Sequence, residues 1–303
     1  MSPEALDKII IAIDPASQLL LAASIVTLMF AIALGLKPEN FAFLKTSPRL
    51  FWGGLFAQII ALPLMTIALA AGLGVGPSVA LGMIVVAACP GGSVSNFMTY
   101  LSRGDVAYSV SLTAGSSIIA AFWTPFAIIF WSDIYPPTSD LLEIIEFNRA
   151  GFVAQTTIML AAPLIAGMTI ARYAPSIADR IKGPLAILGG LTMGGVIVYS
   201  VLDFIPLIKS AWALILIPVA IHNAAAFAMG AGAGWALRGN AAQRRSLTFE
   251  VGIQNAGLAV VLMLSQLDGL GGGAAVAASW GVWHFFSGGA MIAFFRMTTR
   301  SDP

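Results

Sequence analysis

The chain has 303 residues, of which 58% are hydrophobic and only 10% are charged. An average soluble domain is about 45–50% apolar and about 25% charged, so this composition excludes a soluble globular protein and a disordered one, and it indicates an all-α polytopic membrane protein. The 15 basic and 14 acidic residues give a net charge of +1 and the only cysteine is Cys89, which excludes nucleic-acid binding by bulk charge, an internal disulfide and a cysteine-based metal site.

Nine stretches of the chain are apolar enough to form transmembrane helices, each of which needs about 20 mostly apolar residues. Residues 1–16 precede them and carry charges around a short apolar run, which predicts an amphipathic segment at the membrane surface. A cytoplasmic tail is predicted at 297–303. The predicted spans are 17–36, 50–73, 78–101, 105–132, 149–173, 183–204, 210–237, 246–266 and 272–296.

The basic residues are unevenly divided between the two sides that these spans define. The side that holds the N-terminus has only Lys8, Arg149 and Lys209. The opposite side holds the remaining basic residues: Lys37, Lys45, Arg49, Arg103, Arg172, Arg180, Lys182, Arg238, Arg244, Arg245, Arg296 and Arg300. Because Lys and Arg are enriched in cytoplasmic loops, we expect the N-terminus outside, the C-terminus inside and an odd number of spans.

The third predicted span, 78–101, is interrupted at Cys89–Asn96, whose sequence is CPGGSVSN. Proline removes a backbone donor and clashes with the preceding turn, and the two glycines permit backbone conformations that other residues avoid. Ser93, Ser95 and Asn96 are able to cap a second half-helix and to bind a ligand. The alternative is a simple proline kink with small residues for helix packing, but a kink requires no such run of polar residues.

The eighth predicted span, 246–266, contains Glu250. Of the 14 acidic residues, 12 lie in tails, loops or turns and Asp203 lies at the end of a span, so Glu250 alone lies inside an apolar context. A carboxylate in the membrane is costly unless it has partners, so Glu250 is a candidate functional residue. The following residues, Val251–Gly257 (VGIQNAG), interrupt the helix with two carboxamides and two glycines, which is tolerated only beside a cavity or the protein interior. The alternative is a later start of the span, with Glu250 paired to Arg244 or Arg245.

The two interruptions occupy corresponding positions when spans 1–4 are matched with spans 6–9. The offset of five spans is odd, so the second copy is inverted in the membrane and Ser95-Asn96 corresponds to Gln254-Asn255. Paired interrupted helices in two inverted halves indicate the binding site of a secondary transporter. In such sites half-helix N-termini face an anionic substrate, while unwound carbonyls coordinate cations.

The fourth predicted span carries hydroxyls on one helical face, including Ser109, Thr113, Ser116 and Ser117. Neutral oxygens with a single carboxylate suit a monovalent cation better than a divalent one. Hydrogen bonds from these hydroxyls to their own helix are the alternative.

Four further polar residues lie within predicted spans: Gln58, His222, Asn223 and His284. For each of them a structural hydrogen bond between helices is the alternative to a binding role. His284 is flanked by small residues and could therefore line a cavity.

Several of these motifs resemble those of the bile acid:sodium symporter family. The resemblance covers about 17–296 and rests on CPGGSVSNFMTYL (89–101), RGDVAYSV (103–110), EVGIQNAGLA (250–259), LGLKP (34–38) and WHFFSG (283–288). It implies a core domain, 50–132 and 210–296, in which two discontinuous helices cross. It also implies a panel domain, 17–36 and 149–204, that moves against the core.

The resemblance further implies two sodium ions that share Glu250. One site would use Ser95, Asn96, Ser109, Thr113 and Glu250. The other would use Gln58, Glu250 and Gln254 with the backbone carbonyls of Val251 and Ile253. We expect the substrate to contact Pro90, Ser93, Asn255 and His284.

We therefore expect a monomeric, sodium-coupled symporter of an organic anion, such as a bile acid or a small carboxylate, in the lipid bilayer of a bacterial inner membrane. It would work by alternating access. The alternative on the same fold is a proton-coupled carrier in which Glu250 or a histidine titrates. A membrane enzyme that uses Cys89 would need a nucleophile–base pair at a recognisable spacing, and a transporter-like sensor would normally need a signalling domain.

Overall fold

The computed structural model describes residues 2–11, 15–267 and 269–298, and the regular elements in these ranges are helices, with two isolated β-bridges. The long helices are α2 (Pro15–Gly35), α8 (Val106–Ile134), α10 (Arg149–Tyr173), α11 (Pro175–Ser210), α12 (Trp212–Ala236) and α15 (Gly271–Thr298). The short elements are α1 (Pro3–Asp7), η1 (Pro38–Phe41), α3 (Ala42–Thr46), α4 (Pro48–Phe56), η2 (Ala57–Ala61), α5 (Leu62–Leu73), α6 (Pro77–Ala88), α7 (Ser93–Leu101), α9 (Pro136–Ile144), α13 (Ala241–Gly252) and α14 (Ala256–Ser265). Most of the predicted tail at 297–303 lies outside the described residues.

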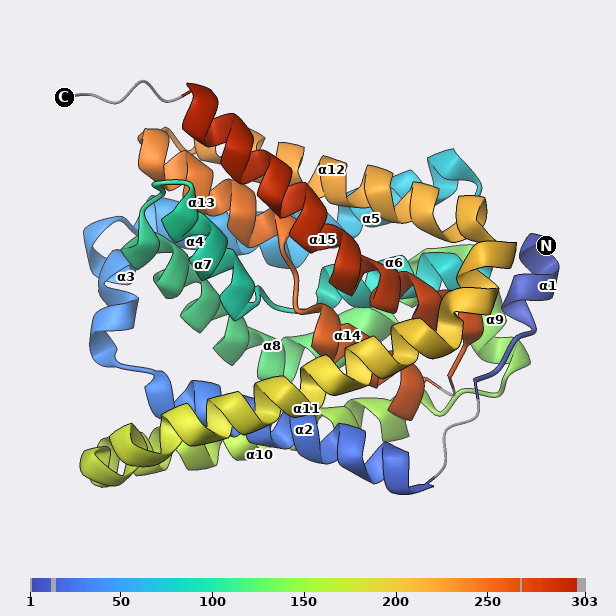
Figure 1. The fold of residues 1–303 in the computed structure, drawn as a ribbon, viewed down its shortest axis with the longest axis horizontal. Coiled ribbons are helices and arrows are strands. Elements are labelled where there is room, and N and C mark those ends of the chain that lie inside the picture. The colour runs from blue at the N-terminus through green and yellow to red at the C-terminus, as the bar shows by residue number, and fades with distance from the viewer. Residues whose placement is uncertain (1, 12–14, 268, 299–303) are drawn as a thin grey trace.

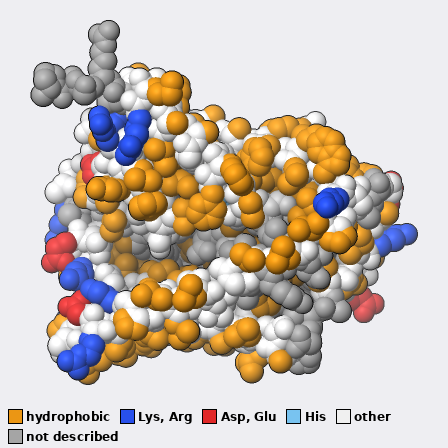
Figure 2. Space-filling view, viewed as in Figure 1, with side chains coloured by type: hydrophobic (Ala, Val, Ile, Leu, Met, Phe, Trp, Pro, Cys, Tyr) orange, Lys and Arg blue, Asp and Glu red, His pale blue; other side chains and the backbone are white. Residues whose placement is uncertain are grey.

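Many large hydrophobic side chains are exposed on the outer surface of the molecule. Within the described residues, five helices are long and apolar enough to cross a membrane: Ala16–Gly35, Pro48–Leu73, Val106–Ile134, Arg149–Tyr173 and Trp212–Ala236. Figure 2 shows hydrophobic side chains over much of one face, with the charged side chains mostly toward its two ends. Long apolar helices with exposed hydrophobic side chains are typical of a multi-pass membrane protein, as the composition predicts.

Three helices, α2, α10 and α11, pack against one another and form a layer along one side of the molecule (Figure 1). We call them the three-helix layer. The other long helices, α8, α12 and α15, and the short pairs α6–α7 and α13–α14 lie together on one side of this layer. The helix α11 extends beyond both ends of the predicted span at 183–204. It starts at Pro175, and proline is favoured in the first turn of a helix.

Two helices are interrupted in the middle of the molecule, at the places that the sequence predicts. The helix α6 ends at Ala88 and α7 begins at Ser93, while α13 ends at Gly252 and α14 begins at Ala256. The two connecting segments meet: Asn255 N donates to the Pro90 carbonyl over 2.9 Å, and an antiparallel bridge joins the segments one residue further on (Figure 1). Each segment therefore satisfies backbone groups that the other leaves free.

A π-helical turn, η2, lies between α4 and α5. Leu62 N donates to the carbonyl of Ala57, five residues earlier, in place of the usual four. Pro63 follows directly and has no N–H with which to continue the regular pattern. Such single π turns are frequent at functional sites, and this one contains Gln58.

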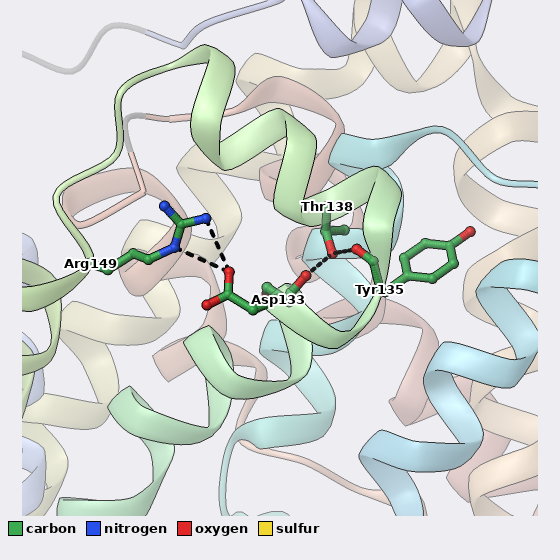
Figure 3. A network of polar contacts seen from close by, with 5 residues as sticks. Asp133, Tyr135, Thr138 and Arg149 are labelled. Atoms are coloured by element: carbon green, nitrogen blue, oxygen red, sulfur yellow. Dashed lines mark hydrogen bonds and ion pairs between the residues drawn. The ribbon is translucent and has the colours of Figure 1, made fainter.

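The turn between α8 and α10 is held together by polar contacts (Figure 3). Asp133 forms an ion pair with Arg149 over 3.1 Å. The Thr138 hydroxyl of α9 lies 2.6 Å from the Ser132 carbonyl and 2.8 Å from that of Tyr135. The ion pair connects the end of α8 directly to the start of α10, and the Thr138 contacts connect α9 to the end of α8.

The N-terminal segment forms the short helix α1, which packs on α6 and α15. Leu6 is buried, and the Asp7 carboxylate accepts hydrogen bonds from Ser78 N (2.9 Å) and Ser78 Oγ (2.5 Å) at the start of α6. The backbone of residues 9–11 pairs with that of residues 269–271 over 2.7 and 2.8 Å. The apolar side of this segment therefore contacts the protein itself.

Candidate functional site

Glu250 lies near the end of α13 and is only 1% exposed. Three hydroxyls from other helices contact its carboxylate: Ser95 Oγ at 2.7 Å, Ser109 Oγ at 3.2 Å and Thr113 Oγ1 at 2.6 Å. The alternative that Glu250 pairs with an arginine is wrong, because the partners of its carboxylate are these hydroxyls of α7 and α8. A buried carboxylate requires such donors, or a cation, to offset its desolvation.

Asn96 brings a further oxygen to the same place. Its Oδ1 lies 2.8 Å from Ser109 Oγ and 3.2 Å from Thr113 Oγ1. We call Ser95, Asn96, Ser109, Thr113 and the Glu250 carboxylate the oxygen cluster. Each of the three hydroxyls has one hydrogen but lies within hydrogen-bond distance of two or three acceptors. The cluster therefore contains more acceptors than its own protons can serve, as a site for a hard cation does.

The oxygen cluster combines one carboxylate with neutral oxygens. In the part of the chain that the structure describes, no group of three His, Cys, Asp or Glu side chains is placed to hold a metal ion. Hydroxyl and amide oxygens favour hard cations, and the single negative charge suits a monovalent ion.

A second group of polar atoms surrounds the end of α13. Gln58 Nε2 donates to the Glu250 carbonyl over 3.1 Å and lies 3.4 Å from Gln254 Oε1, and Gln254 Nε2 donates to the Val251 carbonyl over 2.8 Å. Gln58 Oε1 is buried and has no hydrogen-bond partner among the described residues. Ile253 follows in extended conformation, so its carbonyl belongs to the interrupted segment. These are the residues that the family resemblance implies for a second ion.

Gly91 separates the two groups and lies in close contact with both. A Cβ atom at this position would overlap Glu250 Oε1 and would lie 2.9 Å from Gln58 Nε2. A Cβ at Gly92 would have no neighbour closer than 3.8 Å. The Gly-Gly sequence therefore allows the backbone of the first interruption to approach the carboxylate.

A cavity of about 1020 Å³ lies between the two interruptions and the three-helix layer. Its walls are mostly apolar, with Leu28 and Ile32 from α2 and Ala186 from α11, and the polar residues Asn96 and Gln254 lie at the interruptions. Figure 2 shows the surface hollowed between these groups of helices. The cavity is large enough for a drug-sized molecule, since ligand pockets measure about 300–1,000 Å³.

Of the four residues predicted to contact the substrate, three line the cavity and Pro90 is not among its lining residues. Ser93, Asn255 and His284 line the cavity. Asn255 Oδ1 accepts a hydrogen bond from Leu258 N over 3.0 Å and so caps α14, and neither ring nitrogen of His284 has a partner among the described residues. Pro90 is buried, and its carbonyl accepts the Asn255 N–H.

Two residues that the sequence did not single out as ligands also contact this region. Thr99 Oγ1 donates to Ser109 Oγ over 3.3 Å, and Asn223 Nδ2 donates to the Gly252 carbonyl over 2.8 Å. A polar residue in an apolar span is visible in the sequence, but the direction in which it points depends on how the helices pack.

A pair of interrupted helices beside a buried oxygen cluster and a cavity is the arrangement of a membrane transporter. The chain belongs to the Sodium Bile acid symporter family, whose model matches residues 22–210. This confirms the resemblance of the sequence motifs. The protein is therefore a member of a transporter family and not of an enzyme family.

Several curated proteins are similar to this chain. An uncharacterized sodium-dependent transporter of Bacillus subtilis, YocS, is 27% identical over 90% of this chain and 82% of its own length. The probable chloroplastic sodium/metabolite cotransporter BASS2 of Oryza sativa is 28% identical over 78% of this chain and 54% of its own length. The sodium-dependent organic anion transporter of Mus musculus is 29% identical over 55% of this chain and 46% of its own length. The chain thus spans about half the length of the plant and mouse relatives.

Proposed function

We propose that this protein is a sodium-coupled symporter of an organic anion, such as a bile acid or a small carboxylate. The observation that carries the proposal is the oxygen cluster, in which Glu250 and its neighbours offer more acceptors than protons directly beside the cavity. The names of the Bacillus, rice and mouse relatives, which describe sodium-dependent transporters or cotransporters, support sodium as the ion.

Two sodium ions would share the Glu250 carboxylate. The first would bind within the oxygen cluster, and the second would bind to Gln58, Gln254 and the carbonyls of Val251 and Ile253. Two cations with one carboxylate leave a net positive charge, which would favour an anion in the cavity. With one monovalent anion, such a cycle would move net charge, worth about 2.3 kcal/mol per charge for each 100 mV of membrane potential.

The substrate would bind where the cavity meets the interruptions. The N-terminus of α7 opens there without a side-chain cap, and free amides at a helix N-terminus attract anions. Ser93 and His284 line the same wall and would donate hydrogen bonds to a carboxylate or sulfonate. Asn255 would join them, with the Pro90 carbonyl holding its backbone in place.

Transport would proceed by movement of a panel domain, 17–36 and 149–204, against a core domain, 50–132 and 210–296, in an architecture of nine spans with an inverted repeat. In this proposal the three-helix layer would be the panel. The cavity extends to Asn40 and Lys182, which the distribution of basic residues places on the cytoplasmic side. The structure would therefore correspond to the state that is open to the cytoplasm, with the N-terminus outside, in a bacterial inner membrane.

The test is the thermal stability of the purified protein in sodium, potassium or choline at fixed ionic strength. A ligand that binds the native state stabilises it by mass action, so we expect a sodium-specific rise in melting temperature that Glu250→Ala abolishes. Glu143→Ala, at an exposed position of α9, is the matched control and should keep the rise. Full sodium-coupled uptake by Glu250→Ala would contradict the proposal. Uptake driven by a pH gradient without sodium would indicate a proton-coupled carrier instead.

A further inference from the structure

Three carboxamide side chains donate hydrogen bonds to the last three backbone carbonyls of α13. Gln58 Nε2 donates to the carbonyl of residue 250 (3.1 Å), Gln254 Nε2 to that of residue 251 (2.8 Å) and Asn223 Nδ2 to that of residue 252 (2.8 Å). The last carbonyls of a helix have no partner within the helix, and here they end in the interior, where each group requires a donor. Two of the three amides belong to the proposed second ion site, whereas Asn223 has no assigned role.

Asn223 comes from α12 and is completely buried. Its Oδ1 has no hydrogen-bond partner among the described residues. An unpaired buried acceptor costs about 1–3 kcal/mol, while an apolar side chain of the same volume would leave nothing unpaired. Packing alone therefore does not account for an asparagine here, and its single bond to the Gly252 carbonyl is the contact to be explained.

The position of Asn223 is fixed by the residue before it. His222 Nε2 lies 2.7 Å from Thr66 Oγ1 of α5, and its ring lies 4.8 Å from that of Trp280 in α15. The α12 backbone at this level is thus held between two neighbouring helices. The Asn223 amide presents its N–H to the interruption from a rigid support.

The bond to Gly252 determines the direction of the adjacent carbonyl. Ile253 is extended, with φ −119° and ψ 98°, and successive carbonyls of an extended backbone point to opposite sides. With the Gly252 carbonyl directed toward α12, the Ile253 carbonyl points away from α12. This is one of the two backbone oxygens that the proposed second sodium ion requires.

We propose that Asn223 is a positioning residue for the second ion: it holds the Gly252 carbonyl and so orients the Ile253 carbonyl without touching the ion. This inference rests on the proposed sodium symport. Residues that orient the ligands of a metal typically change its affinity by about 10–100-fold when they are altered.

The test is a sodium titration of the melting temperature for the wild type and two variants. Asn223→Leu has a similar volume but no donor, and Asn223→Ala, which also has no donor and adds no bulk, serves if the leucine variant does not fold. We expect the half-maximal sodium concentration to rise about tenfold or more and the titration to lose its two-ion cooperativity. Thr138→Val is the structural control. It removes a buried hydroxyl that donates to the Ser132 carbonyl in the turn between α8 and α10, so it should lower the melting temperature in choline but leave the sodium midpoint unchanged.

Three results are distinguishable. A wild-type midpoint and cooperativity in both Asn223 variants would overturn the inference while leaving the sodium symport in place. An equal shift of the midpoint in Thr138→Val would also overturn it, because the effect would then be one of general stability. If the wild type itself gives no sodium-specific shift, the proposed function fails and the inference fails with it.

Discussion

Gly91 and Gly92 are adjacent, but only Gly91 lies against the carboxylate of Glu250. We predict that Gly91→Ala abolishes the sodium-dependent rise in melting temperature, because its methyl group would displace Glu250 Oε1 and crowd Gln58 Nε2. Gly92→Ala should retain the rise, since no neighbour of the new methyl group lies closer than 3.8 Å. Both substitutions restrict the unfolded chain in the same way, so the comparison isolates the contact. An equal response of the two variants would refute this account.

Thr113 makes the shortest contact to Glu250, at 2.6 Å. Thr113→Val keeps the shape of the side chain and removes the hydroxyl. Hydrogen bonds to charged groups contribute about 1.5–3 kcal/mol, so we expect the sodium midpoint to rise by about tenfold or more in the thermal assay. Ser116→Ala is the matched control on the same helix, because its hydroxyl donates to the backbone carbonyl of Thr113 and not to the Glu250 carboxylate. A larger effect for Ser116→Ala would contradict the prediction.

At this scale the sequence predicts which residues are unusual more readily than what they contact. Glu250 stands out because an acid within an apolar span needs partners. Ser109 and Thr113 stand out because they share one face of their helix, and in the structure both contact the Glu250 carboxylate. Asn223 and Gln58 look alike in the sequence, as single carboxamides in apolar spans. Only the packing of α12 and of the π turn shows that both direct their N–H groups to the end of α13.

At the scale of elements, α6 is capped by a side chain from a distant segment, since Asp7 accepts both donors of Ser78. We predict that Asp7→Ala lowers the stability by about 1 kcal/mol, as the loss of a helix N-cap usually does. Thermal unfolding in sodium and in choline should show the same decrease. Glu4→Ala, in the same short helix and exposed, should have no measurable effect; an equal decrease there would show that the cap is not the cause.

The interruptions were the most predictable elements. Proline, paired glycines and polar residues within apolar spans disfavour a continuous helix wherever they occur, so their effect is local. The docking of α1 could not be predicted in this way, because its partners in α6 and α15 are far away in the sequence. The composition of residues 1–16 shows one apolar side but does not distinguish a membrane surface from a protein surface.

At the scale of the whole molecule, the division of basic residues predicts which ends of the helices face the cytoplasm. The single cysteine, Cys89, is buried, so a Cys89→Ala background allows single cysteines to be placed at exposed positions. We predict that a membrane-impermeant maleimide labels Asp140→Cys in intact spheroplasts but labels Arg180→Cys only after permeabilisation. The reverse pattern, or equal labelling of both, would refute the predicted orientation.

The pairing of residues 9–11 with 269–271 has a mechanical consequence for the three-helix layer. The helix α2 begins at Pro15, four residues beyond Ile11, and four residues of extended chain reach at most about 14 Å. As long as this pairing holds, the start of α2 stays within that distance of the backbone just before α15. In the proposed movement of the three-helix layer, this corner would be the pivot, and the displacement would be largest at the opposite end of α2.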